Sequence, residues 1–180
     1  HDNFYARIQL TNASLNLSLS GTNVISYTPS DAAAQIYVFE RQTNGSYKLT
    51  NTKTGQVLAV SGDAKTSGTN VLIEDSDNSN GQRWYIYEYS KGVYMLRPVC
   101  ATGLVLSVAS SSTASMANVQ VDTHTGAAGQ KFTITKVADV AGLEPVNVGD
   151  NFYAKIGSAL VNKYFSLSND NVVINSKSNA

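Results

Sequence analysis

The residues best suited to bind a ligand lie in short polar clusters between apolar stretches. Carboxylate and amide oxygens accept hydrogen bonds from hydroxyl groups, and a tyrosine ring offers a flat apolar face for stacking. The candidates of this kind are Tyr27, Asp63, Glu74, Asp77, Asn78, Asp122 and His124. Each has a competing structural interpretation: a turn beside Pro29, a solvated acidic turn in the middle of the chain, and a loop histidine without a role. The sequence alone leaves both interpretations open.

The acidic run at 75–86 is similar to a calcium-binding loop only at its start, where carboxylates alternate. Its sixth position is Asn80 in place of glycine, and its twelfth is Ile86 in place of glutamate. With two histidines and one cysteine, Cys100, the chain also has too few ligands for a structural zinc site and no partner for an intramolecular disulfide. We therefore expect neither a metal nor a cofactor.

The motifs of common catalytic sites are absent from the sequence. There is no nucleophile elbow, no zinc-binding H-E-x-x-H pair and no phosphate-binding loop. Two carboxylates can hydrolyse a glycosidic bond, but they need a cleft and a fixed separation. Nothing in the sequence distinguishes such a pair from acidic turn residues. We expect that this chain is not an enzyme, although a longer parent chain can carry a catalytic domain.

The composition narrows the class of partner. The formal net charge is zero and only 14% of the residues are charged, which argues against a protein that follows nucleic-acid phosphates. No apolar stretch approaches the roughly 18 residues of a membrane span, so we expect no membrane insertion. A surface rich in Ser, Thr, Asn, Gly and Tyr favours a secreted or cell-surface protein.

The chain repeats itself with a step of 47 to 48 residues. A glutamine followed two positions later by an aromatic residue occurs three times, at Gln35 and Tyr37, Gln82 and Trp84, and Gln130 and Phe132. Segment 54–71 matches segment 102–119 at an offset of 48. The first unit matches as well, but its loop is about six residues shorter. Three repeats of this length indicate three equivalent supersecondary units.

A second period of 148 residues is superimposed on the first. Segment 2–8 reappears at 150–156, and segment 17–24 reappears at 165–172 without a gap. We place one three-unit domain at 1–143, and a linker with the incomplete start of a second copy at 144–180; residues 138–149 have the composition of a linker. The apolar residues of the second copy need a partner. We expect a parent chain that continues, and the alternative is packing on a neighbour, including domain swapping.

Within each unit the pattern is that of β-strands. Runs rich in Thr, Val and Tyr, such as 47–51 and 70–74, stand between clusters of Gly, Asn, Ser and Asp. Segment 83–89 alternates, with Trp84 and Ile86 on one face and three tyrosines on the other. The only stretch with helical character is 31–39. About four strands per unit predict an all-β protein of about a dozen strands, closed into a barrel that hides its edges.

The threefold repeat with one Q-x-aromatic mark per unit resembles the ricin-B-type β-trefoil lectins and their bacterial carbohydrate-binding modules. The resemblance covers about 1–137 and resumes at 150–180. It implies a β-trefoil of three units of about 47 residues, followed by the first strands of a second trefoil. It also implies a structural role for the marks: the aromatic residue packs in the shared core, and the glutamine braces the backbone of its unit.

The residues that bind galactose in that family are replaced here. The family's aspartate after the leucine of the L-D-V strand corresponds to Ser18, Ala59 and Ser107, with Ser166 in the second copy. The stacking position is occupied by Tyr27, Glu74 and Asp122, with Asn175 in the second copy. The residue before the glutamine is Ala34, Gly81 and Gly129. No unit has the full set, so the usual galactose-type recognition is not expected.

The resemblance implies a non-catalytic module that binds a glycan or polysaccharide, as an accessory part of a larger secreted bacterial protein such as a glycoside hydrolase. Tandem trefoils suit this role, because weak single sites gain avidity when they are linked. The alternative is a protein-interaction or spacer trefoil whose sugar sites have degenerated. A small concave pocket with an exposed aromatic residue favours the first function, and a broad apolar patch favours the second.

Overall fold

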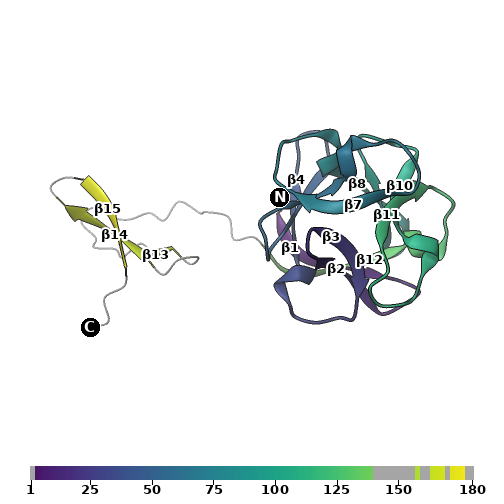
Figure 1. Cartoon of the computed structure of the whole chain (residues 1–180), viewed down its shortest axis with the longest axis horizontal. Coiled ribbons are helices and arrows are strands. Elements are labelled where there is room, and N and C mark those ends of the chain that lie inside the picture. The colour runs from purple at the N-terminus through teal and green to yellow at the C-terminus, as the bar shows by residue number, and fades with distance from the viewer. Residues whose placement is uncertain (1–2, 140–156, 159–162, 169–170, 177–180) are drawn as a thin grey trace. The chain divides into compact units, whose positions relative to one another are not determined.

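The computed structural model describes residues 3–139, 157–158, 163–168 and 171–176 (Figure 1). Contacts divide the chain into an N-terminal part, His1–Val140, and a C-terminal part, Ala141–Ala180, which are described separately. The strands of the N-terminal part are β1 (Phe4–Leu10), β2 (Leu15–Ser20), β3 (Asn23–Tyr27), β4 (Tyr37–Arg41), β5 (Tyr47–Asn51), β6 (Val57–Val60), β7 (Thr69–Glu74), β8 (Arg83–Ser90), β9 (Val93–Pro98), β10 (Leu104–Val108), β11 (Val119–Thr123) and β12 (Phe132–Asp139). Short 3-10 helices lie at Ala33–Gln35, Ser61–Asp63, Asn80–Gln82, Ala109–Ser111 and Ala128–Gln130.

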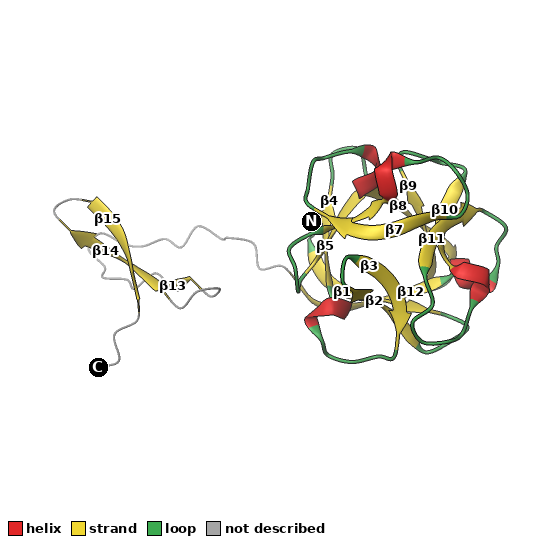
Figure 2. Ribbon diagram, in the orientation of Figure 1, coloured by secondary structure: helices red, strands yellow, loops and turns green. Residues whose placement is uncertain are grey.

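Six strands close into a barrel. Antiparallel pairing runs from β1 to β4, β5, β8, β9, β12 and back to β1, so the barrel has no open edge. The remaining strands form three hairpins, β2–β3, β6–β7 and β10–β11, whose pairing links them into a cap. Figure 2 shows the 3-10 helices gathered at three places around the periphery. The predicted all-β trefoil of three units is therefore confirmed.

The three aromatic marks lie in one core. Tyr37, Trp84 and Phe132 are each fully buried, and all three belong to a single cluster with the leucines and valines of the barrel strands. Burial of aromatic rings supplies much of the stabilisation of such a core. The Trp84 indole N–H donates to the carbonyl oxygen of Leu58 at 2.9 Å. The phenol of Tyr37 is buried as well, and this burial raises its pKa.

The three glutamines brace equivalent loops. Each side-chain N–H donates to the carbonyl seven residues earlier, in the pairs Gln35–Thr28 (2.8 Å), Gln82–Asp75 (2.9 Å) and Gln130–Thr123 (2.8 Å). Each side-chain oxygen accepts the backbone N–H five residues earlier, in the pairs Gln35–Ser30 (2.9 Å), Gln82–Asp77 (3.1 Å) and Gln130–Thr125 (3.0 Å). Because these buried amides are satisfied by backbone groups, they fix the shape of the loop before each barrel strand.

Three asparagines join the units in the cap. Asn23 donates to Asn118 at 2.9 Å, and Asn70 donates to Asn23 at 2.8 Å. Each asparagine occupies the same place in its unit, just before a buried valine. The threefold sequence repeat is thus reproduced in the side-chain hydrogen bonds.

The described strands of the C-terminal part are β13 (Gly157–Ser158), β14 (Lys163–Ser168) and β15 (Asn171–Ser176). Their register repeats that of the first unit at the offset of 148. Leu167 pairs with Val172 as Leu19 pairs with Val24. Likewise β13 pairs with β14 as the end of β1 pairs with β2. The predicted linker at 138–149 overlaps the end of β12 at residues 138–139, and its remaining residues lie outside the described ranges, as does the whole predicted restart at 150–156.

Candidate functional site

Two loops flank the end of the capping hairpin in the third unit. One is the unit's own loop, residues 109–117, and the other is the middle unit's loop, residues 61–69. Gly68 N–H in the middle unit's loop donates to the carbonyl of Val121 at 2.8 Å, and Thr123 N–H donates to the Ser67 hydroxyl at 3.1 Å. The middle unit's loop is therefore fixed beside the end of β11.

A pocket of about 300 Å³ lies between these segments, and we call it the third-unit pocket. Its lining is rich in hydroxyl groups and contains one carboxylate: Ser67, Ser107, Ser110, Ser111, Asp122, Thr123, Thr125, Ala127 and Gln130. The volume falls at the lower end of the range of small-molecule sites, roughly 300–1,000 Å³. Hydroxyls both donate and accept hydrogen bonds, so the pocket suits a small ligand rich in hydroxyl groups.

Asp122 is the charged group of the third-unit pocket. Its carboxylate accepts hydrogen bonds from the Gln120 side chain at 3.0 Å and from the Ser67 hydroxyl at 3.2 Å. A carboxylate has about four lone-pair positions, so it can accept further bonds from a ligand. His124 lies next to this site but is exposed, and it does not belong to the pocket lining. Of the two third-unit candidates, the pocket therefore includes Asp122 alone.

The first unit has a much shorter loop, and this changes two sites. Its hairpin closes through Ser20-Gly21-Thr22, and Thr22 O accepts the Ile73 N–H at 2.9 Å. Because of the trefoil geometry, each hairpin end is flanked by its own loop and by that of another unit. The first unit's short loop therefore leaves Tyr27 without a long loop from its own unit. It also leaves Glu74, in the middle unit, without a long loop from a neighbouring unit. The third unit keeps both walls, which explains its pocket.

Asp63 has a structural contact that is repeated in the third unit. Its carboxylate accepts hydrogen bonds from Gly81 N–H at 2.8 Å and from the Ser79 hydroxyl at 3.0 Å. Ser111, which lies 48 positions later, accepts the Gly129 N–H at 3.0 Å. Both Asp63 and Ser111 adopt a positive φ, near 53° and 52°. Each long loop is therefore tied by a side chain to the 3-10 helix of its own unit.

The other middle-unit candidates also bond within their own unit. Glu74 accepts from Gln82 at 3.0 Å, Asp77 accepts from Ser79 N–H at 2.8 Å, and the carbonyl of Asn78 accepts from Arg83 at 2.6 Å. These candidates lie in one loop region, apart from the third-unit pocket. Their role in ligand binding remains a prediction.

The residue before each glutamine follows from the loop lengths. A methyl group on Gly129 would lie 2.7 Å from Ser111 Cα and 2.8 Å from Val108 O, and one on Gly81 would overlap the Asp63 carboxylate. Glycine at these two positions lets the long loops pack closely. The first unit lacks such a loop and has Ala34 there. The two glycines are thus explained by the close packing of the long loops.

Tyr27 ends β3 and is 42% exposed, as a stacking residue must be. The third unit's loop runs beside it, where Met116 N–H donates to Ser26 O at 2.8 Å. A separate hollow of about 420 Å³ lies nearby, crossed by an ion pair of 2.7 Å between Arg7 and Asp31. Tyr27 is not among the residues that line this hollow. The structure therefore does not bring Tyr27 together with the other candidates.

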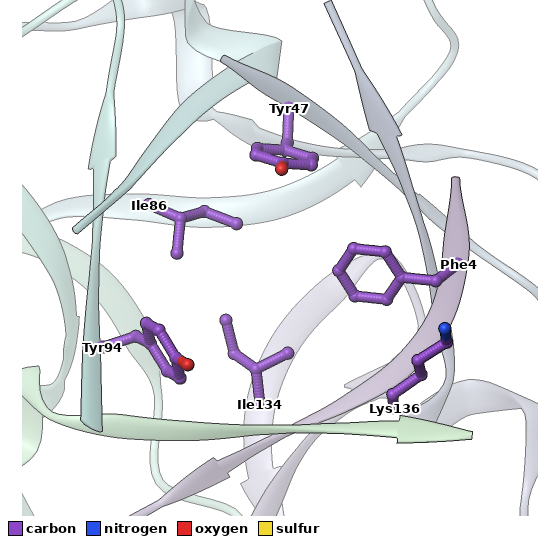
Figure 3. A pocket seen from close by; sticks show the side chains of 6 residues that line it. All are labelled: Phe4, Tyr47, Ile86, Tyr94, Ile134 and Lys136. Carbon is purple, nitrogen blue, oxygen red and sulfur yellow. The ribbon is translucent and has the colours of Figure 1, made fainter. Parts of the chain in front are cut away.

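An apolar pocket of about 480 Å³ lies among the barrel strands (Figure 3). Its lining comes from five barrel strands and follows the repeat: Phe4, Tyr47, Ile86, Tyr94, Ile134 and Lys136. The first-unit counterpart of Ile86 and Ile134 is Phe39, which stacks on Phe4 with ring centroids 4.9 Å apart. The polar groups of this pocket are the Tyr47 and Tyr94 hydroxyls and the Lys136 ammonium, so it lacks the dense set of hydroxyls that lines the third-unit pocket.

A comparison with family profiles shows to which protein family the chain belongs. The profile described as ricin-type beta-trefoil lectin domain-like matches residues 2–74, 32–102 and 80–174. This chain belongs to that family. The overlapping matches follow the threefold repeat and extend into the C-terminal part. Among curated protein sequences, none matches this ricin-type trefoil.

Solved structures with this fold include isolated lectins and parts of longer proteins. A ricin B-like lectin of Macrolepiota procera in complex with lactose is 20% identical, with a TM-score of 0.67 over 76% of this chain and 98% of the lectin. An exo-β-1,3-galactanase of Clostridium thermocellum is 19% identical, with a TM-score of 0.70 over 76% of this chain and 31% of the enzyme. A mosquitocidal holotoxin is 19% identical, with a TM-score of 0.70 over 98% of this chain and 22% of the toxin.

Three other features could give this ricin-type trefoil a different function: a reactive thiol, a metal site or a membrane-spanning helix. Burial raises the pKa of the half-buried Cys100 thiol, and the nearby Asp63 charge adds to the effect. A protonated thiol is a poor nucleophile. Within the described ranges, no three His, Cys, Asp or Glu side chains gather as metal ligands. In the same ranges no helix is long and apolar enough to cross a membrane.

Proposed function

We propose that this ricin-type trefoil is a non-catalytic module that binds a glycan through its third-unit pocket. The observation that carries the proposal is the pocket itself, which forms where two long loops meet and which is lined by hydroxyls around Asp122. A sugar ring presents hydroxyl groups in several directions, and the Asp122 carboxylate and the serine and threonine hydroxyls match them as acceptors and donors. The family and the lactose complex of the Macrolepiota lectin support sugar as the ligand class.

We further propose that the module belongs to a larger secreted protein. The galactanase, in which a region like this chain makes up 31% of the length, supports an accessory role beside a catalytic domain. The repeated register of β13–β15 supports a second trefoil copy at 144–180, next to a first domain at 1–143. A likeness to the holotoxin that spans 98% of this chain is consistent with that arrangement. Two linked sites would gain avidity for a polysaccharide.

The test is a calorimetric titration with galactose, lactose and N-acetylglucosamine, preceded by a glycan array to select further sugars. Asp122→Asn keeps the shape of the side chain but removes its charge. Because a hydrogen bond to a charged group contributes about 1.5–3 kcal/mol, affinity should fall about tenfold or more. The matched control is Glu74→Gln, at the equivalent position of the middle unit, which should leave affinity unchanged.

Two results would contradict the proposal. An absence of binding across the array favours the alternative of a protein-interaction or spacer trefoil. Equal losses for Asp122→Asn and Glu74→Gln would show that the third-unit pocket is not the site.

A further inference from the structure

Three tyrosines of β8 point away from the barrel core, and we call Tyr85, Tyr87 and Tyr89 the tyrosine stripe. Trp84 and Ile86, which alternate with them, face inward. Tyr87 is 45% exposed and Tyr89 is 47% exposed, although both are large aromatic residues. The rings of Tyr85 and Tyr87 have centroids 6.2 Å apart. Two rings of the stripe are thus neighbours, and the exposed Tyr89 follows them along the same strand.

Two cations hold the rings of the stripe. The Arg97 guanidinium carbon lies 5.0 Å from the centroid of Tyr87, and the Lys131 ammonium lies 4.4 Å from the centroid of Tyr89. Cation–π contacts of this kind are attractive, so they help to hold the two rings in place. A surface that is already ordered loses less entropy when a ligand binds, so the stripe is prepared for binding.

A β-bulge directs Tyr89 toward the third-unit pocket. Glu88 pairs with Tyr94 and Ser90 pairs with Val93, so Tyr89 is the extra residue of β8. Bulges re-aim side chains and are frequent beside binding sites. A methyl group on Gly126 would lie 3.5 Å from the Tyr89 hydroxyl oxygen. Gly126 stands between Thr125 and Ala127, which line the third-unit pocket, so the stripe begins where one wall of that pocket ends.

The trefoil fold does not itself require tyrosines at these positions. The positions 48 residues later on β12 are Thr133, Thr135 and Val137. The positions 47 residues earlier, on β4 and just after it, are Val38, Glu40 and Gln42. The strands β4, β8 and β12 have the same backbone role in the barrel, yet the tyrosines occur on β8 alone, where Arg97 of β9 and Lys131 contact two of their rings. This concentration indicates a function of that strand.

We propose that the tyrosine stripe is an extended subsite that binds the continuation of an acidic glycan chain whose other end occupies the third-unit pocket. This inference rests on the proposed function. Tyrosine rings provide flat surfaces for the C–H faces of sugar rings, and their hydroxyls reach the polar rim. Arg97 and Lys131 offer charge-assisted hydrogen bonds to carboxylate or sulfate groups on those sugars. The turn after β8 adds Lys91, whereas Glu88, the one acid of this strand, already accepts the Gly92 N–H at 3.0 Å.

The experiment measures binding of tetragalacturonate and of neutral galactotetraose to the whole chain by calorimetry. The unmodified protein should bind the acidic tetrasaccharide more tightly, and the preference should shrink as salt is added. Tyr87→Ala should lower affinity for tetragalacturonate about tenfold, equivalent to 1.4 kcal/mol. Lys131→Gln should reduce the preference for the acidic chain. The matched control is Thr135→Ala, at the position equivalent to Tyr87 on β12, which should change neither affinity.

The outcomes separate this inference from the proposed function. If Asp122→Asn weakens sugar binding but Tyr87→Ala and Thr135→Ala behave alike, the pocket stands and the stripe is overturned as a subsite. If neither tetrasaccharide binds while a small sugar does, the stripe is overturned in the same way. If Tyr87→Ala leaves sugar binding intact but abolishes self-association in sedimentation, the stripe is an interface between protein copies. The melting temperature of Tyr87→Ala is compared first with that of the unmodified protein, to detect misfolding. Tyr87→Phe keeps the ring and should retain stacking, so it distinguishes misfolding from a lost contact.

Discussion

The first and third units share a backbone plan but differ in what surrounds the end of their hairpins. In the third unit, the loops 61–69 and 109–117 form two walls around Asp122. In the first unit, the turn at Gly21 supplies no equivalent wall, so Tyr27 stands exposed at the end of β3. Identical strand geometry therefore does not make equivalent sites. In this trefoil, loop length decides which of the repeated positions becomes a pocket.

The largest expected effect concerns the contact between the third unit's long loop and the 3-10 helix Ala128–Gln130. Gly129→Ala should destabilise the fold by about 2–3 kcal/mol, because its methyl group would press on the backbone at Ser111 and Val108. The change should also displace Ser111 from the third-unit pocket. The matched control is Ala34→Gly, the same position in the first unit, which should cost no more than about 1 kcal/mol.

Chemical denaturation of the two variants measures the difference. Equal stabilities for Gly129→Ala and Ala34→Gly would mean that the long loop does not pack tightly on the 3-10 helix. The distinction between the units would then lie elsewhere.

A deletion converts the middle unit's loop into that of the first unit. Removing residues 62–67 leaves Ser61-Gly68-Thr69-Asn70, which has the same sequence as Ser20-Gly21-Thr22-Asn23. The chain should still fold, because the first unit closes its hairpin with this sequence. Sugar affinity should fall at least about tenfold, since the third-unit pocket loses the wall that contains Ser67.

Calorimetry on the deletion variant tests this prediction, with Lys65→Ala as control. Lys65 is exposed in the same loop and does not line the pocket. Retained affinity after the deletion would break the link between loop length and binding.

The fold could be predicted because its signals are repeated. Three Q-x-aromatic marks and the 148-residue period fix the number of units and their equivalence, and local patterns then specify the strands. The site was harder to predict, since a pocket depends on loops from different units. The candidates at Asp63 and Glu74 are of suitable types, yet their oxygens bond to Gly81 and Gln82 of their own unit.

The residues that sequence reasoning missed are mostly serines. Ser67, Ser110 and Ser111 have no distinctive type, and only their position around β11 gives them a role in the third-unit pocket. The signal available in the sequence was the loop length itself. Both long loops border the third unit's hairpin, whereas each of the other hairpins borders one short loop.

The smallest expected effect concerns the core mark of the first unit, where Tyr37 corresponds to Phe132 of the third. Within the described part of the chain, no group meets hydrogen-bond geometry at the Tyr37 hydroxyl; burial raises its pKa above the usual 10.0, and the Asn51 side chain offsets part of this rise. Tyr37→Phe removes a buried polar group, so stability near pH 7 should stay equal or rise by about 1 kcal/mol.

The pH dependence of Tyr37→Phe gives the sharper measurement. Below about pH 10 the phenol is neutral in both the folded and the unfolded chain, so its ionisation does not affect stability. As the pH rises above this value, the unfolded chain ionises while the buried phenol does not, and the unmodified protein loses stability. The advantage of Tyr37→Phe should therefore grow between about pH 9 and pH 11 in denaturant titrations. A constant difference across this range would show that the phenol ionises as readily in the folded core as in the unfolded chain.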